Sequence, residues 1–206
     1  MSIATTVIHK RALLALAMAL VASCNAPDVT APSPDDHVRG PAGAKVTLIE
    51  YGDYPCPPCV ASSAAVEQLL ARHPRDVRFI YRHHPGRKRR NAFAAANAAE
   101  AAELQGKFWE MHRALYEGQR DWYSERSPEE VFRRYAQNLR LDLPRFEAAL
   151  QAPDAGRRMR EIYEAGRNVG VRGVPAFFLN GERLVPPPMT YEDLDRRVTA
   201  ALRKAE

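Results

Sequence analysis

Tyr51-Gly52-Asp53-Tyr54-Pro55-Cys56-Pro57-Pro58-Cys59-Val60 is the stretch of sequence that decides the fold. An extended apolar segment, residues 46–50, precedes it, and an amphipathic segment, residues 64–70, follows it. We therefore expect a strand, then a turn that carries the cysteines, then a helix. A thiol at a helix N-terminus lies in a field that favours its thiolate, and a second cysteine one turn later is within disulfide reach. This arrangement suits redox chemistry.

The other segments predict one sheet with helices around it. The helix that carries the cysteines is expected to end near Ala71, and residues 77–82 then form the second strand of a right-handed parallel crossover unit. We also expect a hairpin, whose strands are residues 174–179 and 182–185 and whose turn is Asn180-Gly181. A last helix, capped by Thr190, is expected after it.

Residues 91–169 are expected to be a helical insertion, because Cys59 and Pro175 lie much further apart than the ~30 residues of one crossover unit. Asn91 is a candidate N-cap for its first helix. Ser127-Pro128-Glu129-Glu130 has the form of a capping box, and Asp142 precedes a further helix. Alanine-rich and amphipathic periodicity between these points predicts helix throughout.

The N-terminal segment has the features of an export signal. Lys10 and Arg11 precede an uncharged run, residues 12–21, which is too short to span a bilayer as a mature helix. We expect residues 1–23 to be the signal, residues 24–43, which are rich in proline and glycine, to be a linker, and residues 44–206 to be the folded domain. The protein is therefore expected to work outside the cytoplasm.

Cys24 follows this signal directly. Val21-Ala22-Ser23-Cys24 resembles the lipobox of bacterial lipoproteins, in which the cysteine becomes the lipidated first residue of the mature chain. The chain has three cysteines, so lipidation of Cys24 would leave Cys56 and Cys59 as a pair and no odd thiol. An ordinary cleaved signal with an incidental cysteine is the alternative. The lipobox favours a lipid anchor on a membrane of the bacterial periplasm or cell envelope.

Composition predicts a globular chain: of 206 residues, 46% are hydrophobic and 27% are charged. The basic run Arg87-Lys88-Arg89-Arg90 could suggest a patch for nucleic acid or anionic lipid. Because the protein is expected to be exported and the run has no interleaved aromatic residues, we interpret it as a solvated loop ahead of a helix. We expect no nucleic-acid partner.

A family resemblance depends on three features: Glu50, the motif Cys56-Pro57-Pro58-Cys59, and residues 171–181, which contain Gly173-Val174-Pro175. Over about residues 42–204 the chain resembles the thioredoxin superfamily and, more narrowly, the exported DsbA-type thiol–disulfide oxidoreductases. The resemblance implies an α/β fold, in which a thioredoxin-like mixed sheet is flanked by helices and carries an all-helical insertion. It implies no cofactor other than a redox-active Cys56–Cys59 disulfide.

The resemblance also implies a role for each site residue. Cys56 would be the nucleophile that forms a mixed disulfide, Cys59 the resolving thiol, and Glu50 a buried acid that takes and returns the proton of Cys59. The Val174–Pro175 bond would be cis, face the cysteines and let the Val174 backbone pair with substrate. Substrates would be proteins with thiols or disulfides, and a membrane redox partner would recycle the enzyme.

Tyr54, Pro57 and Pro58 are expected on the surface that contacts substrate, with Tyr54 as an aromatic beside the nucleophile. Neither proline has a backbone N–H, and Pro58 stands where some family members gain a thiolate partner from histidine. We therefore expect a reduction potential nearer to about −180 to −270 mV than to about −120 mV. These residues suit oxidation, reduction and isomerisation alike.

Two other functions fit parts of the sequence. Cys56, Cys59, His83 and His84 could supply four ligands to a metal ion. Adjacent histidines on a strand point to opposite faces, however, so we expect no metal site. A lipid-anchored peptide-binding or chaperone module with a static disulfide is the second alternative. The cysteines' position at a helix N-terminus favours a reactive pair over a structural one.

Overall fold

The structure, a computed structural model, describes residues 29–30, 33 and 36–205. The expected signal and Cys24 lie outside the described residues. Among the residues that are described, every helix is too short or too polar to cross a membrane.

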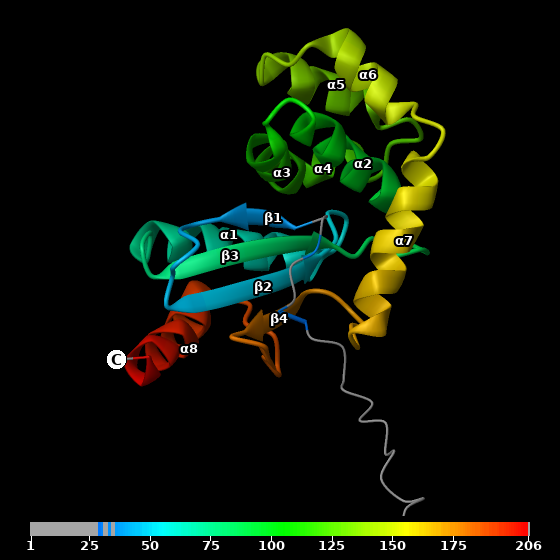
Figure 1. Cartoon of the computed structure of the whole chain (residues 1–206). Helices are drawn as coiled ribbons and strands as arrows, with labels where there is room; N and C mark the ends of the chain where they lie inside the picture. Colours follow the sequence, from blue (N-terminus) through cyan, green and yellow to red (C-terminus); the bar gives the residue numbers. More distant parts are fainter. Residues whose placement is uncertain (1–28, 31–32, 34–35, 206) are drawn as a thin grey trace, which may run out of the picture.

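A five-stranded mixed sheet forms the centre of the molecule, in the order β1-β3-β2-β4-β5 (Figure 1). Strands β2 and β3 run parallel, with Val46 opposite Val77 and Gly52 opposite His83, and the other neighbouring strands pair antiparallel. The strands are β1 (His37–Arg39), β2 (Val46–Gly52), β3 (Val77–His83), β4 (Ala176–Leu179) and β5 (Glu182–Arg183).

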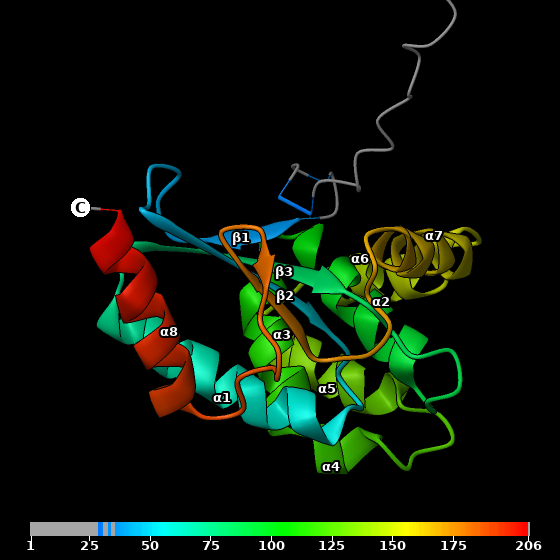
Figure 2. The ribbon, with the colours of Figure 1, turned by 90° about the horizontal axis from the view of Figure 1, so that it is seen from below.

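Helices cover the sheet in two groups. Helices α1 and α8 lie side by side against it (Figure 2). Helices α2 to α6 gather beside the β1 edge, and α7 runs from them past the end of β3 (Figure 1). The helices are α1 (Pro57–Arg72), α2 (Ala92–Glu103), α3 (Phe108–Glu117), α4 (Gln119–Trp122), α5 (Glu129–Asn138), α6 (Leu143–Leu150), α7 (Ala155–Asn168) and α8 (Tyr191–Lys204). This is the expected thioredoxin-like fold, with α2 to α7 inserted between β3 and β4.

Alternation along β2 directs one acidic side chain toward the cysteines. Leu48 belongs to the main core, which also contains Cys56 and Cys59, whereas Ile49 belongs to a separate cluster on the other face of the sheet. Since side chains two apart on a strand share a face, Glu50 points to the same side as Leu48. The continuous apolar character of β2 follows from burial on both faces.

The helix caps confirm some expectations and correct others. Asp142 and Thr190 cap their helices, accepting hydrogen bonds from the backbone N–H groups of Arg145 and Asp193. Asn91 precedes α2 but makes no capping bond: it has a left-handed φ of 59°, which asparagine tolerates. The two N–H groups of its side-chain amide instead face three backbone carbonyls, those of Trp122, Tyr123 and Glu125, at 2.9, 3.2 and 3.0 Å.

The capping box expected at Ser127-Pro128-Glu129-Glu130 is not formed. The first helical hydrogen bond runs from Phe132 N to Pro128 O, so Pro128 is the N-cap and Ser127 lies outside the helix.

The C-terminal boundary predicted for the linker, residues 24–43, is also wrong. His37–Arg39 forms strand β1, which pairs antiparallel with β3. Three residues are too few for alternation to be seen in a segment rich in proline and glycine.

Candidate active site

The two cysteines lie at the N-terminus of α1, directly after the turn that ends β2. Cys56 is the N-cap residue, and its backbone N–H donates to Asp53 O at 3.0 Å. Pro57 and Pro58 occupy the first helical positions, where a missing N–H costs no helical bond. The N–H of Cys59, which donates to Cys56 O at 2.9 Å, is therefore the first amide of the helix that faces the nucleophile.

Cys56 and Cys59 are both free thiols, and their surroundings shift their pKa values in opposite directions. A hydrogen bond from the Cys59 thiol lowers the pKa of Cys56 to about 7, against the opposing effect of burial, and the Cys59 backbone N–H and the charge of Arg89 contribute in the same direction. Burial raises the pKa of Cys59, as do the hydrogen bond to Cys56 and the charges of Cys56 and Glu50. Near pH 7 Cys56 can be a thiolate while Cys59 stays protonated.

Glu50 is 1% exposed and lies beneath this pair. Burial raises the pKa of Glu50 to about 8, although a hydrogen bond from Ser62 opposes the shift. Ser62 Oγ is 3.1 Å from Glu50 Oε1 and 3.0 Å from Cys59 O. A hydroxyl has one proton, so Ser62 donates to one of these oxygens at a time. The sequence interpretation missed Ser62, although it lies one turn after Cys59 on the same helix.

The second half of the site comes from the loop that precedes β4. The Val174–Pro175 peptide bond is cis, as the family resemblance implied. The Val174 carbonyl oxygen is 3.5 Å from Cys56 Sγ. A residue 118 positions away in the chain thus contacts the nucleophile directly.

Tyr54 is not a surface residue, and the expectation that it contacts substrate is wrong. It is 1% exposed, and its hydroxyl bonds His112 Nδ1 at 3.1 Å. Its ring lies 4.8 Å from that of Tyr116 between centroids. The helical insertion covers it through α3, a contact that spacing in the sequence does not reveal. Pro57 and Pro58 are exposed and remain candidates for substrate contact.

The sequence interpretation also missed an ion pair beside the nucleophile. Asp53, which is 2% exposed, accepts hydrogen bonds at Oδ2 from Gly86 N at 3.0 Å and from Arg89 Nη1 at 2.8 Å. Burial raises the pKa of Asp53, and the hydrogen bonds from Arg89 and Gly86 oppose that shift. The basic run is therefore more than a solvated loop, because one of its arginines is held next to the turn that carries Cys56.

Replacing Arg89 with glutamine is expected to raise the pKa of Cys56, because it removes a positive charge that favours the thiolate. The thiolate fraction at pH 7 should fall by about twofold. Thiolate absorbance during a pH titration measures this. Arg89→Lys keeps the positive charge, so Cys56 should titrate in it as in the wild type. An unchanged Cys56 titration in Arg89→Gln would contradict the effect assigned to the charge of Arg89.

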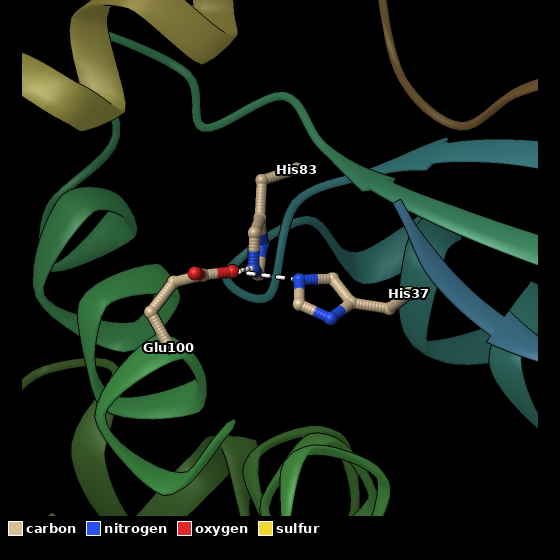
Figure 3. A group of neighbouring side chains, drawn as sticks. All are labelled: His37, His83 and Glu100. Atoms are coloured by element: carbon tan, nitrogen blue, oxygen red, sulfur yellow. Dashed lines mark hydrogen bonds and ion pairs between the residues drawn. The ribbon is translucent and has the colours of Figure 1, made fainter. Parts of the chain in front are cut away.

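A second polar cluster, formed by His37, His83 and Glu100, joins the sheet to the helical insertion (Figure 3). His37 Nε2 and His83 Nε2 lie 2.6 and 3.1 Å from the same oxygen of Glu100. The three side chains are buried and come from β1, β3 and α2. Strand β1, which the sequence interpretation missed, thus completes the cluster.

These three side chains place their ligating atoms within 4.8 Å of one another, the kind of donor set that zinc accepts. Arg158 Nη2, however, lies 2.9 Å from the second oxygen of Glu100. A guanidinium there neutralises the carboxylate and repels a cation. We interpret the cluster as a structural junction.

The metal site considered for the cysteines is not assembled either. His83 bonds Glu100, and the His84 ring stacks on Tyr163 with centroids 4.5 Å apart.

Glu100→Gln is expected to destabilise the protein by about 2–4 kcal/mol at pH 7, because it breaks a buried charged network. Burial opposes ionisation of Glu100, but hydrogen bonds from His37 and His83 hold its pKa below the usual range. A depressed carboxyl pKa stabilises the fold above the unfolded pKa, near 4.5, and this stabilisation is lost as the pH falls.

The difference in unfolding free energy between wild type and Glu100→Gln should therefore shrink below about pH 4.5. Urea unfolding at several pH values measures it, and the exposed Glu103→Gln on the same helix is the matched control. Equal effects of the two variants would rule out a stabilising junction.

Comparisons with known proteins agree with the thioredoxin-like fold seen in the structure. A family model described as "Thioredoxin" matches residues 32–200. A thioredoxin-like oxidoreductase from Silicibacter pomeroyi DSS-3 is 28% identical, with a TM-score of 0.68 over 84% of this chain and 95% of that one. Alpha-DsbA1 from Wolbachia pipientis is 17% identical, with a TM-score of 0.74 over 84% and 94%.

Among curated proteins, Na(+)/H(+) antiporter NhaA 3 from Salinispora tropica is 40% identical over 176 residues. This match covers 82% of the chain and 25% of the antiporter, so the chain spans about a quarter of the length of that relative. Similar proteins therefore include much longer ones.

Proposed function

The chain belongs to the thioredoxin family, whose model matches residues 32–200, and we propose that it is a DsbA-type protein that exchanges disulfides with protein thiols through Cys56 and Cys59. One observation carries the proposal: the two thiols have opposite pKa shifts at a helix N-terminus that faces Val174. A static disulfide needs no such difference, whereas exchange needs one thiol that attacks and leaves readily.

The oxidation of a substrate dithiol can be written from these residues. A substrate thiolate attacks Cys56 Sγ, the Cys56–Cys59 bond breaks, and its electron pair goes to Cys59 Sγ, which takes a proton from Glu50. A second substrate thiolate then attacks the substrate sulfur of the mixed disulfide and releases Cys56 as a thiolate. The substrate gains a disulfide, and the protein becomes a dithiol; the reverse sequence reduces a substrate disulfide.

Glu50 suits the proton transfer because its pKa, raised to about 8 by burial, lies near working pH. Ser62 can bond this carboxyl in both protonation states. It donates to Glu50 Oε1 when the carboxyl is ionised, and it can donate to Cys59 O and accept the carboxyl proton when Glu50 is protonated. Val174, beside the cis bond, is the backbone that would pair with the substrate chain. Pro57 and Pro58 form the exposed edge next to the nucleophile.

We also propose that the protein is exported and held at a bacterial envelope membrane by lipid on Cys24, as the N-terminal sequence predicts. A membrane redox partner would restore the cysteines after each turnover.

The reduction potential of the Cys56–Cys59 pair tests whether the pair is redox-active and how strongly oxidising it is. We expect a midpoint between about −180 and −270 mV, because a Cys56 pKa of about 7 is typical of thioredoxin-type thiols rather than of the strongest oxidants. Equilibration with a glutathione series measures it, with Cys56→Ser as the control that shows no redox couple. A midpoint near −120 mV would contradict the expectation. Trapping thiols in cells then gives direction: mostly oxidised cysteines indicate a disulfide donor.

A further inference from the structure

A surface hollow of about 630 Å³ lies beside the candidate active site. Its walls come from the loop after β3, from α7 and from the segment before β4. The lining residues are His84, Gly86, Arg87, Lys88, Arg89, Tyr163, Arg172, Gly173 and Val174. We call this surface the basic groove.

Two residues of the basic groove connect it to the nucleophile, Val174 by direct contact and Arg89 through Asp53. Val174 lines it and places its carbonyl oxygen 3.5 Å from Cys56 Sγ. Arg89 lines it and bonds Asp53, whose backbone carbonyl accepts the N–H of Cys56. A chain that paired with Val174 would therefore enter the groove within a few residues of its reacting cysteine.

The charge of the basic groove is positive and incompletely neutralised. Its described lining includes four cationic side chains and no acidic one. Asp53 pairs with Arg89 at 2.8 Å, and the exposed Glu164 lies 3.7 Å from Arg87. The remaining two cations, Lys88 and Arg172, have no carboxylate partner among the described residues.

Two further contacts define this surface. Arg172 Nη1 donates to the carbonyl oxygens of Arg167 and Val171, which holds the guanidinium near the segment before β4. Burial, together with the positive charges of Arg167 and Arg89, lowers the pKa of His84 to about 4. His84 is therefore neutral at pH 7, and the charge of the groove comes from its arginines and lysine.

We infer that the basic groove binds acidic residues of a substrate polypeptide, next to the cysteine that exchanges with Cys56. This inference rests on the proposed function, because the segment that carries Val174 sets where the substrate chain lies. Clefts lined by one sign of charge raise the association rate of oppositely charged partners and reject like-charged ones. The groove thus selects protein substrates with acidic sequence near the target cysteine.

Three matched peptides test this. Each carries the same two reduced cysteines, flanked on both sides by glutamates, glutamines or lysines. Mixed with the oxidised full chain, each peptide is converted to its disulfide while Cys56 and Cys59 become a dithiol, and the loss of peptide thiols is timed. At low ionic strength the glutamate peptide should react about tenfold faster than the glutamine peptide, and this ratio should approach one in ~0.5 M salt.

The matched variants locate the effect. Lys88→Glu combined with Arg172→Glu should reduce the ratio of glutamate to glutamine rates to about one or below. Arg75→Glu is the control, because Arg75 is exposed and precedes β3, at the opposite end of the parallel strands from Cys56. It should keep the ratio.

The outcomes are distinguishable. A ratio of one in the wild type, or a ratio lost equally in Arg75→Glu, overturns the groove while leaving the proposed function intact. The proposed function and the groove are overturned together if the oxidised chain oxidises none of the three peptides and the reduced chain reduces none of their disulfide forms.

Discussion

Replacing Cys59 with serine should trap substrate proteins on Cys56 as mixed disulfides, with lifetimes at least about a thousandfold longer than in the wild type. In the wild type, Cys59 lies one turn from Cys56, with its N–H 2.9 Å from Cys56 O, so its attack on a mixed disulfide is intramolecular. Intramolecular groups in such positions have effective concentrations of about 10⁵ M or more, far above any free thiol. Serine cannot displace a thiolate, so the mixed disulfide persists.

Mass spectrometry after incubation of Cys59→Ser with a peptide disulfide measures the trapped species, and the adduct should map to Cys56. The balance is simple: the Cys56 thiolate displaces one peptide thiolate and keeps the other peptide half. The matched control is Cys56→Ser, because both thiols are buried and the pKa of the remaining one, Cys59, is raised by burial, whereas that of Cys56 is lowered. The absence of adducts in Cys59→Ser would favour a static pair, and equal adducts in both variants would contradict the assignment of Cys56 as the nucleophile.

The reaction centre is the part that sequence predicts best, since its determinants are local. Helix α1 begins at the cysteines, as the sequence predicts. Because its first two residues are prolines, which have no backbone N–H, Cys59 supplies the first backbone N–H of the helix. Glu50 lies on β2, and its burial follows from its apolar neighbours and from the alternation of that strand. The cis bond at Val174 and the individual roles of Cys56, Cys59 and Glu50 needed the family resemblance.

What sequence could not provide depends on contacts between distant segments. Tyr54 belongs to a turn, where aromatics are usually exposed, but α3 brings His112 and Tyr116 over it. Asp53 looks like an ordinary turn residue until Arg89 reaches it across 36 positions. Strand β1 is three residues long and exists because β3 offers it an edge. Each case is decided by tertiary packing rather than by local propensity.

The basic run shows how such contacts change an interpretation. As a sequence, Arg87-Lys88-Arg89-Arg90 is a run of like charges, which solvation explains adequately. In the fold, Arg89 lines the basic groove and also neutralises a buried carboxylate, whereas Lys88 lines the groove with no carboxylate partner among the described residues. Neighbouring residues of one run thus have different roles, which Arg89→Gln and the Lys88→Glu double variant test separately.

Glu50→Gln should stabilise the dithiol protein against unfolding at pH 9 by on the order of 3–5 kcal/mol and have little effect at pH 5. Burial raises the pKa of Glu50 from 4.5 to about 8. Between these values the unfolded chain has lost a proton that the folded protein keeps, so stability falls as the pH rises through this range. Glutamine has no such penalty and can still accept a hydrogen bond from Ser62.

Urea unfolding in the presence of reductant at pH 5, 7 and 9 measures this effect. The cysteines titrate in both proteins, and their contribution differs only through the charge of Glu50, which raises the pKa of Cys59. Glu103→Gln, which changes an exposed carboxyl on α2 in the same way, is the matched control. An equal gain at pH 5 and pH 9 would mean that Glu50 is already ionised at low pH in the folded protein.

The same substitution separates a proton carrier from a residue that only packs. Since Glu50 is assigned the proton of Cys59, Glu50→Gln should slow resolution of the mixed disulfide by about ten- to a hundredfold at pH 7. It should also remove the inflection near pH 8 from the rate profile of that step, whereas Glu50→Asp, which keeps a carboxyl on a side chain one methylene shorter, should restore part of it. A slower but still inflected profile in Glu50→Gln would assign the proton to another group. Greater stability combined with slower exchange is the result that a buried catalytic acid predicts, because the carboxyl destabilises the fold that depends on it for chemistry.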